Sequence, residues 1–206
     1  MAETDQPQIY LITPPEFDPS SFPERLSRVL DAADIACIRL ALATRDEDRL
    51  LRAADAVREV AHRHDVALVI DTHVVLAQRL GLDGVHLPDG ARGVRHARKE
   101  LGPDAIVGAY CGASRHDGLT AGETGADYVS FGPVGGTALG DGTLAERELF
   151  EWWSAMIELP VVAEGGLTPE VVASLAPVTD FFAVGEEIWS AEDPVAALHD
   201  LTEAMG

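Results

Sequence analysis

The chain has 206 residues, 47% of them hydrophobic, and 35 acidic against 15 basic side chains give it a formal charge of −20. Such a negative charge argues against nucleic acid and anionic membrane surfaces as partners, and solubility is its simplest role. The length and hydrophobic content suffice for one sizeable core, and no linker divides the chain. We therefore expect one domain over residues 1–206.

The cysteines and the start of the chain bear on its compartment. Cys37 and Cys111 lie in apolar, strand-like runs, without the spacing of a zinc site or a disulfide framework. The opening residues lack the basic and apolar regions of a secretory signal, and no apolar run is long enough to span a membrane. We expect a protein of the reduced cytoplasm.

Eight times in succession, a short apolar segment typical of a strand is followed by a segment with helical spacing. The strands are expected at Ile9–Ile12, Ile35–Leu42, Val66–Ile70, Gly84–Leu87, Ile106–Tyr110, Tyr128–Phe131, Pro160–Glu164 and Phe181–Val184. The helices are expected at Ser20–Ala33, Asp46–His64, Val74–Leu80, Val94–Leu101, Asp117–Thr124, Glu146–Ile157, Pro169–Leu175 and Pro194–Met205.

Eight such units in a chain of this length predict an α/β fold, a single (β/α)8 TIM barrel. The alternative, a doubly wound open sheet, more often has five or six units and a GxGxxG near its start, which this sequence lacks. In a barrel the loops after the strands build the site, so the residues that end the strands are the candidates. They are Thr13, Arg39, Asp71, His86, Tyr110, Gly132, Glu164 and Gly185.

The stretch GADYVSFGPVGGT, residues 125–137, runs from a predicted strand into a glycine-rich loop. Its glycines leave backbone N–H groups unshielded and Thr137 adds a hydroxyl, which are the parts of a phosphate cradle. Taken alone, such a loop is more often a plain turn, and it favours a phosphate site only together with other glycine-rich strand ends. Phosphate sites in barrels commonly follow strands seven and eight, where Gly165, Gly166 and Gly185 lie.

Four segments of the chain resemble thiamine phosphate synthase and the related thiazole tautomerase group, which share one small barrel. They are IYLIT, LDGVHL, GADYVSFGPVGGT and VVAEGGLT, in the family's order and at its spacing. The resemblance extends from Ile9 to about Leu198 and implies a phosphorylated small-molecule ligand and a role in thiamine biosynthesis. The family's synthase joins a pyrimidine methyl diphosphate to a thiazole phosphate and expels pyrophosphate with the help of magnesium.

Many catalytic positions of that family are replaced in this chain, although Arg39 is retained on the second strand. The replacements are Cys37, Ala41, Thr72, Ala91, Leu139 and Gly140, with Tyr110 or Cys111 in place of a serine and Gly185-Glu186-Glu187 in place of another. They remove the two expected lysines and the expected metal carboxylates. Because cations and hydrogen-bond donors promote the departure of pyrophosphate, we expect weak or no synthase activity.

The retained polar residues predict an acidic barrel mouth. We expect Asp71, Asp89, Glu164 and Glu186 to converge on one cavity, with Arg39 as the only strand-end cation. Asp71 and Asp89, one residue out of the family's register, are the candidate metal ligands, and Mg²⁺ is the candidate cofactor. In the competing arrangement the two glutamates after the eighth strand face solvent and the glycines hold one phosphate.

Several candidate residues also have a structural interpretation. Glu164 is an acid or base, or it forms a salt bridge with Arg39. His86 is a ligand contact or a core histidine. The candidate binding residues are Arg39, His86, Gly132, Thr137, Glu164, Gly165, Gly166, Gly185 and Glu186.

Two functions fit this pattern. One is a divergent relative of thiamine phosphate synthase that binds a phosphorylated small heterocycle and, if active, is a transferase. The alternative is a non-catalytic small-molecule or metal-binding barrel of the same descent. Of Trp152 and Trp153 on an outer helix, one is expected to pack inward, and the other is a candidate homodimer contact.

Overall fold

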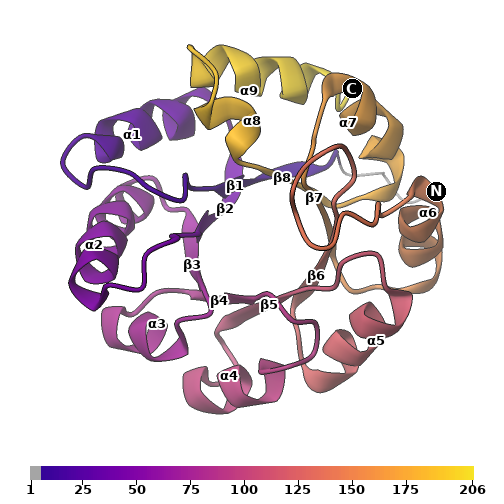
Figure 1. Ribbon diagram of the computed structural model, residues 1–206, viewed down its shortest axis with the longest axis horizontal. Helices are drawn as coiled ribbons and strands as arrows, with labels where there is room; N and C mark the ends of the chain where they lie inside the picture. Colours follow the sequence, from indigo (N-terminus) through magenta and orange to yellow (C-terminus); the bar gives the residue numbers. More distant parts are fainter. Residues whose placement is uncertain (1–5) are drawn as a thin grey trace.

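The computed structural model describes residues 6–206, in which eight short strands alternate with helices (Figure 1). The strands are β1 (Gln8–Ile12), β2 (Ile35–Leu40), β3 (Ala67–Asp71), β4 (Gly84–Leu87), β5 (Ile106–Tyr110), β6 (Tyr128–Phe131), β7 (Val161–Glu164) and β8 (Phe181–Val184). The helices are α1 (Phe22–Ala32), α2 (Glu47–Arg63), α3 (Val74–Leu80), α4 (Val94–Leu101), α5 (Arg115–Thr124), α6 (Arg147–Met156), α7 (Pro169–Leu175), α8 (Glu186–Trp189) and α9 (Pro194–Glu203).

The strands form a closed parallel barrel, which confirms the predicted (β/α)8 fold. Each strand pairs with the next along the chain, and β8 pairs with β1 to close the ring. In Figure 1 the barrel is seen end-on, with the helices around it. The predicted domain includes residues 1–5, which lie outside the described part of the chain.

Most predicted elements differ from the observed ones by one or two residues at an end, and three differences have identifiable causes. Helix α5 begins earlier than expected because the Ser114 hydroxyl caps it by accepting a hydrogen bond from the Asp117 N–H. The 3₁₀ turn Ala176–Val178 and the helix α8 were not predicted. Segments of three and four residues are too short to show a helical repeat.

The strands alternate between two separate cores. On β4, Val85 and Leu87 belong to the large core between the barrel and its helices, whereas His86 belongs to the network inside the barrel. A smaller cluster that includes Tyr10 and Tyr128 lies inside the barrel. Side chains of successive strand residues point to opposite faces, so one strand can face both the barrel interior and the outer core.

Of the two tryptophans on α6, Trp153 packs inward. It is 1% exposed, its ring meets that of Phe131 edge-on at 5.0 Å, and its indole N–H donates to the Leu159 carbonyl. Gly118 on α5 makes room for it, since a Cβ there would lie 2.7 Å from the Trp153 ring. Trp152 is half-buried under the guanidinium of Arg115. Within residues 6–206, none of the helices has the length and apolar character needed to cross a membrane.

Replacing these tryptophans one at a time tests the packing. We expect Trp153→Ala to lower the free energy of unfolding by about 3–5 kcal/mol, because it leaves a large cavity in the core. Trp152→Ala, the matched control, is expected to cost about 1 kcal/mol, a typical value for a point substitution that opens no core cavity. Urea unfolding measures both, and equal losses in the two variants would contradict this assignment.

Candidate functional site

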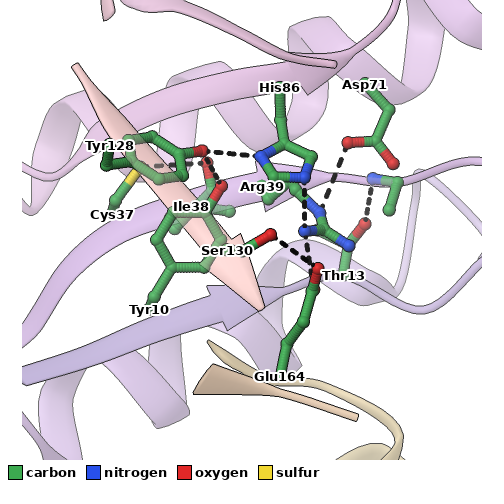
Figure 2. A network of polar contacts seen from close by, with 11 residues as sticks. Tyr10, Thr13, Cys37, Ile38, Arg39, Asp71, His86, Tyr128, Ser130 and Glu164 are labelled. Carbon is green, nitrogen blue, oxygen red and sulfur yellow. Dashed lines mark hydrogen bonds and ion pairs between the residues drawn. The ribbon is translucent and has the colours of Figure 1, made fainter. Parts of the chain in front are cut away.

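Arg39 and Glu164 form a buried ion pair inside the barrel, where the strands end (Figure 2). Nη1 of Arg39, on β2, lies 2.9 Å from Oε2 of Glu164, the last residue of β7. Their exposed fractions are 8% and 1%. The other carboxylate oxygen of Glu164 accepts a 2.8 Å hydrogen bond from the Ser130 hydroxyl. The salt bridge that the sequence left open is therefore present.

Asp71, the last residue of β3, brings a second carboxylate to Arg39. Its Oδ1 lies 3.3 Å from Nε of Arg39, and neither atom has a hydrogen bond within the described residues. Burial raises the pKa of Asp71 to about 6, although the positive charge of Arg39 opposes this shift. Burial also works against the charge of Arg39, but Glu164 and Asp71 raise its pKa above the ordinary value. Two carboxylates thus compensate one guanidinium.

His86 connects this pair to two tyrosines. Its Nε2 lies 3.1 Å from Nη1 of Arg39 and its Nδ1 lies 2.9 Å from the Tyr128 hydroxyl. Because a guanidinium only donates hydrogen bonds, Nε2 must accept and Nδ1 must carry the hydrogen. Burial and the charge of Arg39 hold the pKa of His86 well below its usual range. His86 is therefore a neutral histidine inside a hydrogen-bonded network. The network continues through the Tyr128 hydroxyl, which lies 2.6 Å from the hydroxyl of Tyr10.

The glycines after β6 and β7 pack against each other. The N–H groups of Val134 and Gly135 donate to the Gly165 carbonyl at 2.9 and 3.0 Å. A Cβ at Gly135 would lie 2.0 Å from the Gly166 carbonyl oxygen, and one at Gly132 would lie 2.2 Å from the carbonyl oxygen of Glu164. Figure 1 shows the segment between β6 and α6 lying over the end of β7. Close backbone contact accounts for these glycines, and their role in ligand binding stays a prediction, as does that of the exposed Thr137.

After β8, the structure directs Glu187 rather than Glu186 towards the neighbouring loop. The Gly185 N–H donates to Oε2 of Glu187 at 2.9 Å, and the Leu167 N–H donates to Oε1 at 3.2 Å. Glu186 is exposed and does not join this contact. Neither arrangement expected from the sequence describes this geometry, because the first placed Glu186 in the mouth and the second turned both glutamates to solvent.

The two predicted metal ligands have different surroundings. Asp71 faces Arg39, whereas Asp89 is exposed and lines a cavity of about 520 Å³ with Tyr110, Cys111 and Asp141. Within residues 6–206, no group of three or more His, Cys, Asp or Glu side chains is arranged to hold a metal. Because Asp71 is paired with Arg39, the structure gives no support to a magnesium centre on this pair, and a metal at Asp71 and Asp89 stays a prediction.

The cysteines do not supply a nucleophile. Cys37 and Cys111 are both free and buried. Burial raises the pKa of each thiol to about 12, so both are protonated at neutral pH.

Comparison with known proteins identifies the family. The thiamine monophosphate synthase family matches residues 9–188. The chain belongs to this family. Thiamine-phosphate synthase of Rhodospirillum centenum is 41% identical over 201 residues, which cover 96% of this chain and 97% of the relative. That of Erythrobacter litoralis is 40% identical over 203 residues, 95% of each chain.

A solved structure supports the fold. Thiamine phosphate pyrophosphorylase from Pyrococcus furiosus superimposes with a TM-score of 0.83 at 23% identity, over 96% of this chain and 95% of that one. The resemblance noted from four sequence segments is therefore confirmed over most of the chain.

Some of the positions that depart from the family's pattern have a structural role in this chain. The Leu139 side chain packs over Gly165, where a Cβ would lie 2.7 Å from its Cδ2. Gly140 has a positive φ of 63°, and a Cβ there would lie 2.6 Å from the Tyr110 hydroxyl oxygen. A lysine at position 140 would therefore need the Tyr110 side chain to move.

Sequence reasoning missed the roles of Tyr10, Tyr128 and Ser130 in the network around Arg39. The signal was present in part, because Tyr128 and Ser130 alternate along β6 with the outward-packed Val129 and Phe131. Two polar side chains in alternate positions of a buried strand indicate a polar barrel interior.

A double-substitution series tests the buried pair. We expect Glu164→Leu alone to lower the free energy of unfolding by about 3–5 kcal/mol, because it leaves a buried guanidinium without its main counter-charge. Arg39→Met with Glu164→Leu should cost clearly less than the sum of the two single changes. Chemical denaturation measures the series, and strictly additive costs would show that the two side chains do not interact.

The neighbouring glycines of the β6 loop provide a second test. We expect Gly135→Ala to lower the free energy of unfolding by about 1–3 kcal/mol, because its methyl group would overlap the Gly166 carbonyl. Gly136 has no atom within 4 Å of a Cβ and no positive φ, so Gly136→Ala should stay within about 0.5 kcal/mol of the unsubstituted protein. Thermal unfolding compares them, and a neutral Gly135→Ala would refute the packing explanation.

Proposed function

We propose that this chain binds a phosphorylated small heterocycle related to thiamine biosynthesis at its barrel mouth and has weak or no thiamine phosphate synthase activity. The observation that carries the proposal is that Arg39, the retained cation, is already paired with two carboxylates. Its Nη1 and Nε face Glu164 and Asp71, so its charge is compensated within the protein. A homodimer and a cytoplasmic location remain part of the proposal.

The synthase reaction needs positive charge where pyrophosphate leaves. Preorganised cations and donors at such a position commonly supply about 10²–10³-fold in rate each. The positions that the family fills with lysines hold Ala41 and Gly140 here, and Tyr110 occupies the space beside Gly140. With Arg39 committed to two carboxylates, the described mouth offers little to stabilise a departing diphosphate.

The alternative, a non-catalytic barrel of the same descent, is favoured by the same internal pairing. The contacts of Glu164 with Arg39 and Ser130 hold the mouth together without a substrate. The first proposal takes a phosphorylated heterocycle, as the family resemblance implies, whereas the non-catalytic alternative takes a neutral or cationic small molecule. A thermal-shift series with thiazole phosphate, pyrimidine diphosphate, pyrophosphate, free thiamine and divalent metals separates these ligands, because only a bound ligand raises the unfolding temperature.

A direct assay tests the loss of activity. With Mg²⁺, thiazole phosphate and pyrimidine diphosphate, we expect product formation at least about 10²-fold slower than by the Rhodospirillum centenum relative assayed alongside, because several donors are missing. Quenched samples separated by chromatography measure thiamine phosphate. Turnover within about tenfold of the relative would overturn the proposal.

A further inference from the structure

The loop that joins β6 to α6 contains a segment, residues 136–142, that hydrogen bonds do not fix to the barrel. Within residues 6–206, the hydrogen bonds of this segment are local ones between Asp141 and its near neighbour Thr143. Most of its residues are exposed. A backbone segment without long-range hydrogen bonds depends on side-chain contacts for its position.

Contacts at Leu139 and Gly140 connect this segment to the barrel. Leu139 packs over Gly165, as described above. Gly140 lies against Tyr110, because a Cβ at Gly140 would be only 2.6 Å from the Tyr110 hydroxyl oxygen. The side chain of Tyr110 therefore supports the turn of the loop.

The same hydroxyl also holds the start of the loop. It donates a 2.7 Å hydrogen bond to the carbonyl of Gly132, the first residue after β6. Tyr110 is itself fixed, since it ends β5 and its carbonyl accepts from the Gly90 N–H at 2.8 Å. Burial raises the pKa of Tyr110 to about 12, so the hydroxyl is a protonated donor at neutral pH. One side chain thus joins two points of the loop to β5.

The loop and Tyr110 border the cavity of about 520 Å³ at the strand ends. Tyr110 lines this cavity together with Gly140, Asp141 and Thr143 of the loop, and the loops after β4 and β5 supply its other lining residues. A cavity of this size is within the range of small-molecule sites. Because the loop forms part of its wall, a change in the position of the loop changes the shape of the cavity.

The geometry points to Tyr110 as a positioning residue, which holds Gly132 and Gly140 so that the β6 loop forms the wall against which the heterocyclic ligand binds. Tyr110 acts through the loop and takes no part in proton transfer or in the departure of a group. The inference rests on the proposed function for the kind of ligand, and it adds a residue and a cavity to that proposal.

The order of the loop without ligand provides the first test. NMR relaxation gives the backbone order parameter of Gly140 in the unsubstituted chain, Tyr110→Ala and Tyr110→Phe. We expect Tyr110→Ala to lower it from the rigid range, about 0.85, to below about 0.6, and Tyr110→Phe to lower it less because the ring remains. Thr120→Val is the matched control, since it removes a hydroxyl that donates to a backbone carbonyl on the outer helix α5.

The affinity for thiazole phosphate provides the second test. We expect calorimetry to show a Kd about two- to tenfold weaker in Tyr110→Phe, which is the range that corresponds to one lost neutral hydrogen bond, and weaker still in Tyr110→Ala. Thr120→Val should bind as the unsubstituted chain does. The unfolding temperature of each variant shows that it is folded at the temperature of the titration.

Two glycines of the loop show whether the effect passes through the contact with Tyr110. Gly140 and Gly142 both have a positive φ, but a Cβ at Gly142 would have no atom within 4 Å. We expect Gly140→Ala to weaken thiazole phosphate binding in the unsubstituted chain and to have a smaller effect in Tyr110→Ala, where the overlap with the hydroxyl is removed. Gly142→Ala should have the same effect in both backgrounds.

Two results would overturn the inference. One is an unchanged order parameter of Gly140 in folded Tyr110→Ala. The other is a mobile loop with an unchanged Kd in both Tyr110 variants, since Tyr110 would then have a structural role only.

Failure of the proposed function gives different results. If the unsubstituted chain does not bind thiazole phosphate, the proposed ligand is rejected, and the order parameters measured without ligand still decide whether Tyr110 holds the loop. Fast turnover in the synthase assay would reject the proposed loss of activity, whatever the order of the loop.

Discussion

The permanent charge of Arg39 inside the barrel is the constraint on which the other polar groups depend. An arginine cannot lose its proton in a protein, so a buried guanidinium must be compensated by anions and acceptors. The barrel provides Glu164 and Asp71 as anions and the neutral ring of His86 as an acceptor, from three different strands. Ser130 in turn satisfies the second oxygen of Glu164. Each of these residues is placed by the need to balance one charge.

This network limits the chemistry of the mouth. A group that already donates and accepts within the protein must break those contacts before it can serve a ligand, and each contact in a dry interior is costly to break. Internal pairing is also found at the rim, where the carboxylate of Glu187 accepts hydrogen bonds from backbone N–H groups of two loops. The chain has the barrel of its family, and several polar groups at the strand ends are paired within the protein.

Sequence alone predicted the strands and their order well, because each strand is a short apolar run bounded by turn residues. β4 is an example: Gly84 begins it and Pro88 follows it, and the observed bounds match the predicted ones. The arrangement of the site was harder to predict from the sequence. Local pattern indicated that an acidic residue follows β8, but the turn of a four-residue helix decides that Glu187, and not Glu186, reaches the neighbouring loop. Glycine patterns were ambiguous for a physical reason, since a phosphate cradle and close backbone packing both require the absence of a Cβ.

The contact between the β6 and β7 loops limits what a shared glycine motif implies. At Gly135 and Gly166 each backbone fills the space that a side chain on the other would need, so a substitution at either position alone is expected to be destabilising. Folding alone is therefore enough to require both glycines, whichever ligand the mouth takes. Two proteins that share this motif share a backbone contact, and the motif by itself does not fix a common substrate.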